Sequence, residues 1–327
     1  MDIDLRLAQI SDIHMSRRPD DGMVFQAEAG RLLAQAITQI NALPGLDCVL
    51  VTGDLVDKGT PDELDDVLAQ LANLRVPWYA IPGNHDVAFR PNPDLLNRRR
   101  FFEQVAAATP ADSDAYDGAA ERGSWTILLK PGVRLIALDS NIPGDWSGEI
   151  DTTQLAWLET TLDAATEPLV VLMVHHPLHK VFGGWERPEF AGQDWNKFFC
   201  NNGAEVRALL DRYPQVRLVL TGHDHVSRVD QFKGRLHIAA PALSSYPLAF
   251  RTIHVHGIER GWTFTWQTYT PADDALLAEA QAKLESGTLG QAFAPADPHQ
   301  FAVVSEGQAS DRQGRLQVRP RPMRNAR

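Results

Sequence analysis

The stretch CVLVTGD, residues 48–54, is an apolar run followed directly by a polar loop signal. Four consecutive apolar residues predict a strand that is buried on both faces, as in a parallel sheet. Gly53 and Asp54 follow at the end of that strand. The same order, an apolar run and then a short polar motif, recurs after four other segments: residues 5–10, 78–81, 169–174 and 216–220.

The polar motifs contain three kinds of metal ligand: carboxylate, imidazole and amide oxygen. They are Asp12-Ile13-His14, Gly53-Asp54, Gly83-Asn84-His85-Asp86, His175-His176-Pro177 and Gly222-His223-Asp224-His225. Any one alone has an ordinary explanation, such as a helix N-cap for Asp54 or a turn for Asn84. Together, at the ends of strands that a parallel sheet would align at one edge, they predict a site for two divalent cations that hydrolyses a phosphate ester.

In two motifs the candidate ligands are two residues apart: Asp12 and His14, and His223 and His225. At the end of an extended strand, residues i and i+2 point to the same side. We therefore expect each pair to face a metal and the residue between its members to face away. Gly222 is expected to let the backbone turn tightly.

Helical periodicity alternates with these strands and predicts a mostly parallel sheet. The expected helices cover residues 27–43, 61–74, 152–162 and 205–213. After residue 230 the apolar and polar residues alternate, which predicts an antiparallel second sheet. Its expected strands are residues 235–239, 250–256 and 262–270. Two sheets packed face to face with helices outside are the simplest architecture.

The chain is divided into a domain of residues 1–270 and a C-terminal segment of residues 271–327. A helix is expected over residues 273–284. From Gly287 onward the chain is rich in Gly, Pro, Gln and Arg, so we expect an extended tail.

The net charge of −11, with scattered Lys and Arg, argues against stable nucleic-acid binding and against a membrane partner. Cys48 and Cys200 cannot make a disulfide framework. The N-terminus has no basic segment followed by a long apolar run, and no stretch of about 18 apolar residues occurs. These features predict a cytoplasmic protein.

The run of motifs resembles the calcineurin-like metallophosphoesterase superfamily over residues 5–270. Within it, the motifs around Asn84 and His175 are most similar to bacterial class III cyclic-nucleotide phosphodiesterases and glycerophosphodiesterases. Protein serine/threonine phosphatases typically carry Glu where this chain has Asp86. The resemblance implies an α/β fold, a four-layer αββα sandwich of two mixed β-sheets flanked by helices. It also implies a homodimer or a higher homo-oligomer.

The resemblance further implies which residue holds which ion. Asp54 would bridge two metals, and a hydroxide between them would attack phosphorus. The first metal would be held by Asp12, His14 and His225, and the second by Asn84, His175 and His223. Mixed oxygen and nitrogen ligation is compatible with Fe, Mn, Zn or Co. His85 is the candidate catalytic acid or hydrogen-bond donor in the transition state; alternatively, His85 only orients Asn84. Asp86 is expected to orient His85 or to support the ligands from behind.

Substrate contacts are expected from an aromatic-rich cap, residues 178–203. Its candidates are His179 and Trp185, together with His176 in the preceding motif. A hydrophobic cluster under a long loop and a dimer contact are the alternatives for the cap. His176 is equally well explained as a packed residue. The arginines at 98–100 could steer anions, but a solvated helix start explains them better.

The function predicted from these features is a dinuclear metal-dependent phosphodiesterase for a small diester, a 3′,5′-cyclic nucleotide or a glycerophosphodiester. A phosphomonoesterase, or an enzyme that cleaves both ester types, is the alternative within the same fold. A metal-free binding module is an alternative of another class, but such a module would lack ligands, and none is missing here. The acidic composition argues against a nuclease.

Overall fold

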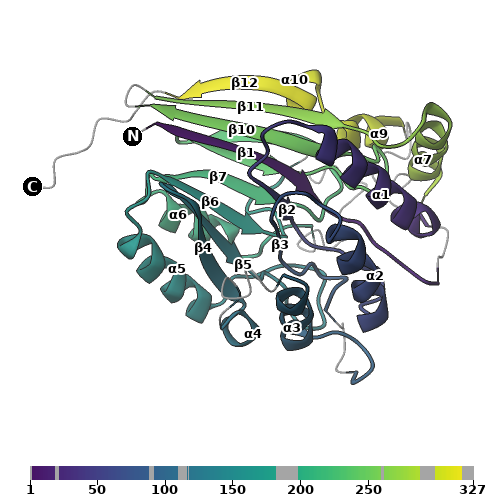
Figure 1. The fold of residues 1–327 in the computed structure, drawn as a ribbon, viewed down its shortest axis with the longest axis horizontal. Helices are drawn as coiled ribbons and strands as arrows, with labels where there is room; N and C mark the ends of the chain where they lie inside the picture. Colours follow the sequence, from purple (N-terminus) through teal and green to yellow (C-terminus); the bar gives the residue numbers. More distant parts are fainter. Residues whose placement is uncertain are drawn as a thin grey trace, which may run out of the picture.

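The computed structural model describes residues 2–18, 22–87, 92–109, 116, 118–181, 198–258, 261–287 and 299–318. Two six-stranded mixed sheets are flanked by helices, as Figure 1 shows. This arrangement confirms the predicted α/β sandwich.

The first sheet joins strands from both ends of the chain, in the order β12-β11-β10-β1-β2-β3. Its strands are β1 (Ile3–Ile10), β2 (Cys48–Val51), β3 (Trp78–Ala80), β10 (Phe250–Ile258), β11 (Gly261–Tyr269) and β12 (Gln313–Val318). β1, β2 and β3 are parallel, whereas β10 pairs antiparallel with β1 on its other side. The carboxyl ends of β1, β2 and β3 therefore lie at one edge.

The second sheet has the order β4-β5-β6-β7-β9-β8. Its strands are β4 (Ser124–Lys130), β5 (Val133–Leu138), β6 (Leu169–Val174), β7 (Val216–Thr221), β8 (Arg228–Phe232) and β9 (Arg235–Ala239). β5, β6, β7 and β9 run parallel, and an antiparallel strand closes each edge.

The described helices are α1 (Gln26–Ala42), α2 (Pro61–Leu71), α3 (Arg98–Ala108), α4 (Ala119–Arg122), α5 (Thr152–Ala164), α6 (Gly203–Leu210), α7 (Asp274–Ser286), α9 (His299–Glu306) and α10 (Ala309–Arg312). The α2 helix begins as predicted, because the Thr60 side chain accepts a hydrogen bond from the Glu63 N–H. The α3 helix begins at Asn97, whose side chain accepts from the Arg100 N–H.

The core explains why β6 is apolar throughout. Val171 and Met173 point into the main core, which contains residues of both sheets together with α1 and α2. Val170 and Leu172 point the other way and pack with residues of α5 and α6. A strand covered on both faces can have no polar side.

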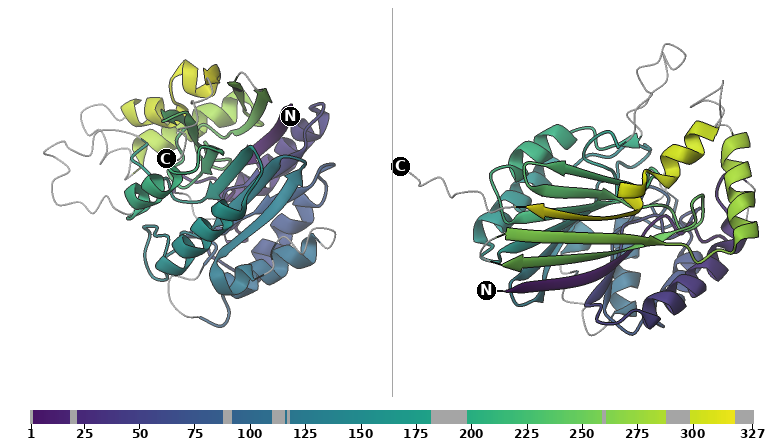
Figure 2. Two further views of the ribbon diagram at one scale, coloured as in Figure 1. Left: turned by 90° about the vertical axis from the view of Figure 1, so that its left-hand side faces the viewer. Right: turned by 90° about the horizontal axis from the view of Figure 1, so that it is seen from above.

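The prediction that the late strands form a separate antiparallel sheet is wrong. β9 joins the second sheet parallel to β7, whereas β10 and β11 extend the first sheet beyond β1. The alternating polarity in β10 and β11 arises because one face of these strands is buried and the other is only half-buried. Figure 2 (right) shows these strands at the surface of the molecule. The alternating pattern therefore indicates an exposed face, but it does not indicate which strand is the hydrogen-bonded neighbour.

The extended tail expected after Gly287 is also wrong for residues 299–318. They form α9, α10 and β12, and β12 pairs with β11 over Trp262 to Gln267. The Trp266 indole N–H donates to the Ser310 carbonyl at 2.9 Å. The composition could not reveal this edge strand, because it is held by backbone hydrogen bonds. The division of the chain at residue 270 stays a prediction.

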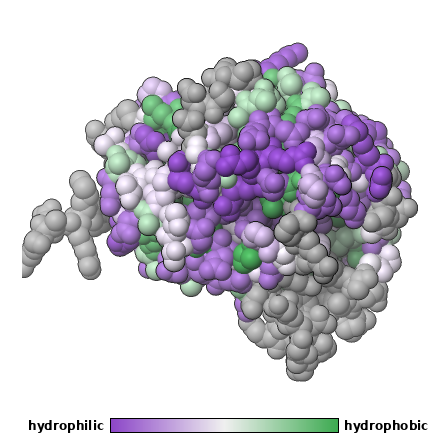
Figure 3. Space-filling model, turned by 90° about the horizontal axis from the view of Figure 1, so that it is seen from below, coloured by the Kyte–Doolittle hydropathy of each residue, from purple (hydrophilic) through white to green (hydrophobic). Residues whose placement is uncertain are grey.

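None of the described helices combines the length and the apolar character needed to cross a membrane. Figure 3 shows one face of the molecule on which hydrophilic residues dominate the described surface. Hydrophobic residues form only small, scattered patches there, in line with the acidic composition.

Candidate metal centre

The predicted ligands come together from both sheets. They lie in the loops after β1, β2 and β3 of the first sheet and after β6 and β7 of the second. Backbone hydrogen bonds join the loops in pairs: the Asp12 N–H donates to the Gly53 carbonyl at 3.0 Å, and the Gly222 N–H to the His175 carbonyl at 2.9 Å. The site therefore lies where the carboxyl ends of strands from two sheets meet, not at the edge of a single sheet.

One ligand group contains Asp12, His14 and His225, all of which are buried. The Nε2 atoms of His14 and His225 lie 3.1 Å apart. His225 Nε2 is also 3.4 Å from Asp12 Oδ1. These are the three residues that the resemblance implied for one metal.

Asp54 connects this group to the other predicted ligands. Its Oδ2 atom lies 3.7 Å from His14 Nε2 and 3.4 Å from His175 Nε2. His175 Nε2 is in turn 3.1 Å from Asn84 Oδ1. His223 forms a possible ligand group with His175 and His176. The structure thus brings all seven predicted ligands together, with the Asp54 carboxylate in a central position.

The orientation of the histidine rings fits divalent cations. His175 Nδ1 lies 2.7 Å from the Thr52 carbonyl oxygen, which can only accept a hydrogen bond. In the neutral ring, Nε2 therefore keeps its lone pair, and this lone pair faces the oxygens of Asp54 and Asn84. His225 Nδ1 is hydrogen-bonded to the Ser245 hydroxyl at 2.7 Å, which fixes the orientation of the ring with Nε2 facing the ligand group. Lone pairs that converge in a buried space require a proton or a cation between them.

The electrostatics of the site favour cation binding. Burial raises the pKa of Asp54, but the His175 and His85 imidazoles outweigh it and hold this pKa well below its usual value. For His175, burial lowers the pKa, whereas Asp54 and Asp12 raise it to about 9. The negative field that draws a proton to His175 also attracts a metal ion, which competes for the same lone pair.

Five of the predicted ligands have left-handed backbone conformations. Their φ angles are 54° at Asp12, 48° at His14, 52° at Asp54, 74° at His223 and 56° at His225. The expectation that i and i+2 share a side because the strand is extended is therefore wrong, although both members of each pair reach the site. Strained backbone of this kind persists only where the surrounding structure imposes it, and it is concentrated at functional sites.

Two glycines are explained by close approach between loops. A Cβ atom on Gly83 would overlap the Asp54 side chain, and one on Gly222 would overlap the Ser11 hydroxyl. Gly222 is thus needed for space next to Asp12. The backbone also turns tightly here as expected, because the Asp224 N–H donates to the Gly222 carbonyl at 2.9 Å, but the left-handed residue of this turn is His223.

His85 lies beside the ligands. Its backbone N–H donates to Asp54 Oδ1 at 2.9 Å, and its Nδ1 donates to the Asp57 carbonyl at 3.0 Å. The Nε2 atom is therefore the ring nitrogen left for another partner. The Asp57 carboxylate, which sequence reasoning missed, lies 3.6 Å from His85 Nδ1. The one sequence feature that could have suggested Asp57 is its position three residues after the predicted ligand Asp54.

Asp86 does not orient His85; of the two expected roles, its contacts fit that of a group that supports the ligands. Its carboxylate accepts hydrogen bonds from the backbone N–H groups of Gly83, Val56 and Leu55, at 2.8, 2.8 and 3.1 Å. Burial, followed by the nearby Asp54, raises the pKa of Asp86 to about 7. Asp86 therefore holds the loop that carries Asp54.

A pocket of about 280 Å³ opens beside the predicted ligands. Ile13 faces away from it into the core as expected, but Asp224 lines it, so that part of the expectation is wrong. Its apolar lining comes from distant segments: Met23, Val24, Trp146, Phe198 and Phe301. Phe198 belongs to the expected aromatic-rich cap, whereas sequence reasoning missed the other four. No local pattern could have connected residues so far apart in the chain.

Two of the three candidate substrate contacts, His176 and His179, are not among the described residues that line this pocket. Both nitrogens of His176 are engaged, with the Ser140 hydroxyl at 2.8 Å and the Trp146 carbonyl at 3.0 Å. His179 Nε2 lies 3.0 Å from the Asp230 carboxylate. Trp185 and most of the expected cap, residues 182–197, lie outside the described residues.

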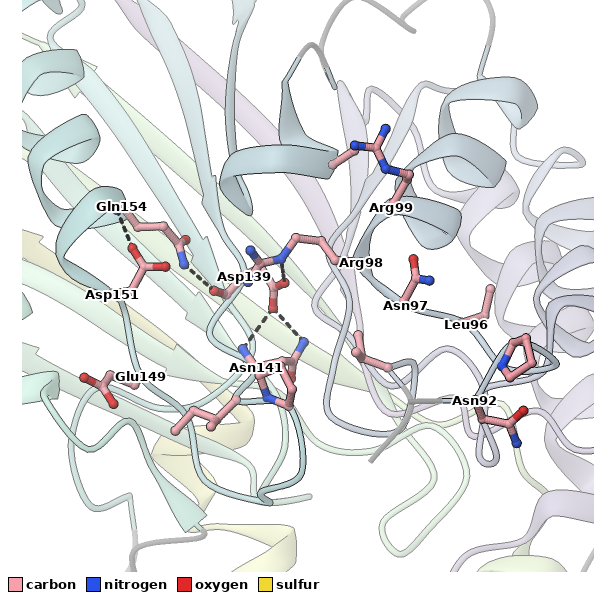
Figure 4. Close-up of a pocket in the computed structure, with 15 residues that line it drawn as sticks. Asn92, Leu96, Asn97, Arg98, Arg99, Asp139, Asn141, Glu149, Asp151 and Gln154 are labelled. Atoms are coloured by element: carbon pink, nitrogen blue, oxygen red, sulfur yellow. Dashed lines mark hydrogen bonds and ion pairs between the residues drawn. The ribbon is translucent and has the colours of Figure 1, made fainter. Parts of the chain in front are cut away.

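The largest described cavity lies elsewhere. It measures about 920 Å³ and lies between the start of α3 and the loop after β5 (Figure 4). Arg98 points across it to the Asp139 carboxylate, at 2.7 Å. Arg100 donates to the carbonyls of Pro93 and Leu95. These contacts support the start of α3, which is the explanation favoured above for the arginines at 98–100. None of the predicted metal ligands lines this cavity.

An αββα sandwich with a buried set of mixed nitrogen and oxygen ligands defines a candidate metallohydrolase. The sequence model of the calcineurin-like phosphoesterase family matches residues 5–227. The chain belongs to this family, which confirms the resemblance and the prediction of a phosphoesterase.

Curated relatives include bacterial phosphodiesterases. The chain is 29% identical to a 3′,5′-cyclic-nucleotide phosphodiesterase of Nostoc sp. over 225 residues, which cover 68% of this chain and 71% of the relative. It is 28% identical to the glycerophosphodiester phosphodiesterase GpdQ of Enterobacter lignolyticus, covering 72% and 76%. It is also 28% identical to the 3′,5′-cyclic adenosine monophosphate phosphodiesterase CpdA of Escherichia coli, covering 73% and 76%.

Among solved structures, the fold is similar to that of a dimetal phosphatase from Danio rerio. The TM-score is 0.61 at 17% sequence identity, and the match covers 82% of this chain and 97% of that protein. At this identity the likeness concerns the fold alone.

Proposed function

We propose that this chain is a dinuclear metal-dependent phosphodiesterase for a small diester, either a 3′,5′-cyclic nucleotide or a glycerophosphodiester. The observation that carries the proposal is the central position of Asp54, whose carboxylate lies within 3.7 Å of His14 Nε2 and 3.4 Å of His175 Nε2. A carboxylate between two sets of nitrogen ligands is the arrangement that two neighbouring divalent ions need.

Asp54 would contact both ions. The other ligands would divide into Asp12, His14 and His225 for one ion and Asn84, His175 and His223 for the other. The first set forms one candidate ligand group, and His175 contacts Asn84 and lies in a group with His223. The donor set is compatible with Fe, Mn, Zn or Co. When bound, the ions would supply an activated water and would neutralise the phosphoryl oxygens.

The protein's own groups keep this donor set in place. The Thr52 carbonyl and the Ser245 hydroxyl fix the rings of His175 and His225. His85 would donate a proton from Nε2 to the departing ester oxygen. Its Nδ1 already donates to the Asp57 carbonyl, so donation from Nε2 requires the protonated ring.

Two observations support a diester over a monoester. The relatives described above are named for diesters. Moreover, no lysine or arginine is found among the described residues that line the 280 Å³ pocket. A monoester dianion carries an additional negative charge, which would find no cationic side chain in that lining.

The experiment is reconstitution of the protein with Mn²⁺ or Zn²⁺, followed by metal analysis and two parallel assays. We expect about two metal equivalents per chain. We also expect faster turnover of bis(p-nitrophenyl) phosphate than of p-nitrophenyl phosphate. Faster monoester turnover would favour the phosphomonoesterase. A purified protein that retains neither ion would point to the metal-free binding module.

A further inference from the structure

The lining of the pocket beside the predicted ligands is of two chemical kinds. Part of it consists of predicted ligands, among them Asp54, Asn84 and His223. The rest includes five apolar side chains: Met23, Val24, Trp146, Phe198 and Phe301. A substrate with its phosphate at the ligands would have these apolar side chains available for the rest of an ester group.

Trp146 is a large apolar side chain at the surface of the protein, with 49% of its area exposed. Its ring meets the His85 ring edge-on, with centroids 5.0 Å apart. Its backbone carbonyl accepts a hydrogen bond from His176 Nε2 at 3.0 Å, and the Ser147 N–H donates to the Asp145 carboxylate at 2.9 Å. The indole is thus an exposed aromatic surface on a loop held by hydrogen bonds, next to the proposed acid.

Phe301 lines the same pocket from α9, outside the residues that match the family. It is 5% exposed, because it packs into the main core and only borders the pocket. The α9 helix is held by specific contacts. The Ser305 carbonyl accepts from the Ser227 N–H at 2.9 Å, and the Tyr246 hydroxyl donates to the Glu306 carboxylate at 3.4 Å. The C-terminal segment of this chain therefore completes the pocket with an aromatic ring.

We infer that Trp146 and Phe301 form a binding surface for a planar aromatic group of the substrate. The inference rests on the proposed function and narrows it to a diester that carries a nucleobase or an aryl ring. Stacking on an aromatic side chain is worth about 1–3 kcal/mol per base. A glycerol group instead needs hydrogen-bond partners, which the side chains of Trp146 and Phe301 do not provide in this pocket.

The test measures binding, not turnover. The Mn²⁺-loaded protein is titrated calorimetrically with phenylphosphonate and with methylphosphonate, which share the anionic group and differ in the aromatic ring. The wild-type protein should bind phenylphosphonate about 5- to 150-fold more tightly, the range that the stacking energy predicts. Trp146→Ala should remove most of this preference and leave the affinity for methylphosphonate unchanged.

Two further variants sharpen the test. Phe301→Leu keeps an apolar side chain but removes the ring, so it should also reduce the preference. Val303→Ala changes an exposed residue of the same helix and should behave like the wild type. Circular dichroism confirms that each variant is folded.

Equal binding of the two phosphonates by the wild type would overturn the inference. So would a Trp146→Ala variant that weakens both ligands to the same extent, because the residue would then only shape the loop. The outcome is separable from the proposed function. A protein that prefers phenylphosphonate but hydrolyses no diester would refute the proposed activity and leave the aromatic surface in place.

Discussion

The Asp57 carboxylate lies 3.4 Å from His14 Nδ1, on the side of the ring opposite the nitrogen that faces Asp54. Both side chains are buried. Burial raises the pKa of Asp57, but the His14 ring, together with Lys58 and His85, outweighs burial and lowers this pKa. A carboxylate in this position holds the imidazole in one orientation and increases its basicity toward a metal.

Asp57→Asn should therefore weaken metal binding or activity by about 10- to 100-fold, the usual effect of removing such a partner. Manganese titration and kcat/KM on an aryl diester measure both quantities. Asp62→Asn is the matched control, because Asp62 makes only an exposed ion pair with Arg17 among the interactions described. Wild-type affinity and activity in Asp57→Asn would show that His14 needs no such support.

Asp54→Ala should abolish metal retention and activity together. Its carboxylate is the group that lies near both His14 and His175, so both ligand sets lose a member. Metal analysis after gel filtration, together with the diesterase assay, checks this expectation. A variant that keeps about two equivalents would remove Asp54 from its proposed bridging position.

His85→Ala should reduce kcat by about 10²- to 10⁴-fold and leave the metal content nearly unchanged. The backbone N–H that donates to Asp54 remains in the variant, since alanine keeps it. Metal content and kcat are measured on the same preparation. Loss of a metal ion in this variant would mean that His85 supports the ligands and does not act as the acid.

Removal of residues 288–327 should destabilise the protein. If this segment were an extended tail, its removal would leave the stability unchanged. The deletion removes β12 from the sheet edge and takes Phe301 and Ala302 out of the core. We expect a lower Tm and a weakened preference for an aromatic phosphonate. A shorter deletion after Val318 keeps β12 and is the control. An unchanged Tm in the longer deletion would show that the C-terminal elements contribute little stability.

His237 predicts a pH dependence of stability away from the metal site. Its side chain is 3% exposed, and neither ring nitrogen has a hydrogen-bond partner among the described residues. Burial, followed by His179, holds the pKa of His237 well below its usual value. The unfolded chain would take up a proton near pH 6.5 that the folded state rejects, so the free energy of unfolding should fall as the pH drops below this value.

His237→Leu should abolish this contribution, worth up to about 2 kcal/mol between pH 6.5 and 5. Urea unfolding at pH 7.5 and pH 5.0 measures it. At pH 7.5 the variant should be as stable as the wild type, because no hydrogen bond is lost. His256→Gln, at a position where the side chain is 41% exposed, is the control. An identical loss of stability at pH 5.0 in His237→Leu and the wild type would contradict the prediction.

The local pattern was sufficient for the motifs and for the strands that precede them. Residues 48–51 are apolar because β2 is buried, and Asp54 follows because a strand that ends at a sheet edge can present a polar loop. The ligand residues could be predicted for this reason, since strand, loop and ligand are all adjacent in the chain.

Only the tertiary structure decided which strands are neighbours and what surrounds the ligands. β10 lies beside β1, and Phe301 lies in one pocket with His14, although hundreds of residues separate them in sequence. Strand pairing depends on backbone hydrogen bonds that every residue except proline can make, so the side chains do not specify the partner. Apolar contacts are likewise non-directional, and their partners are determined by how the two sheets pack.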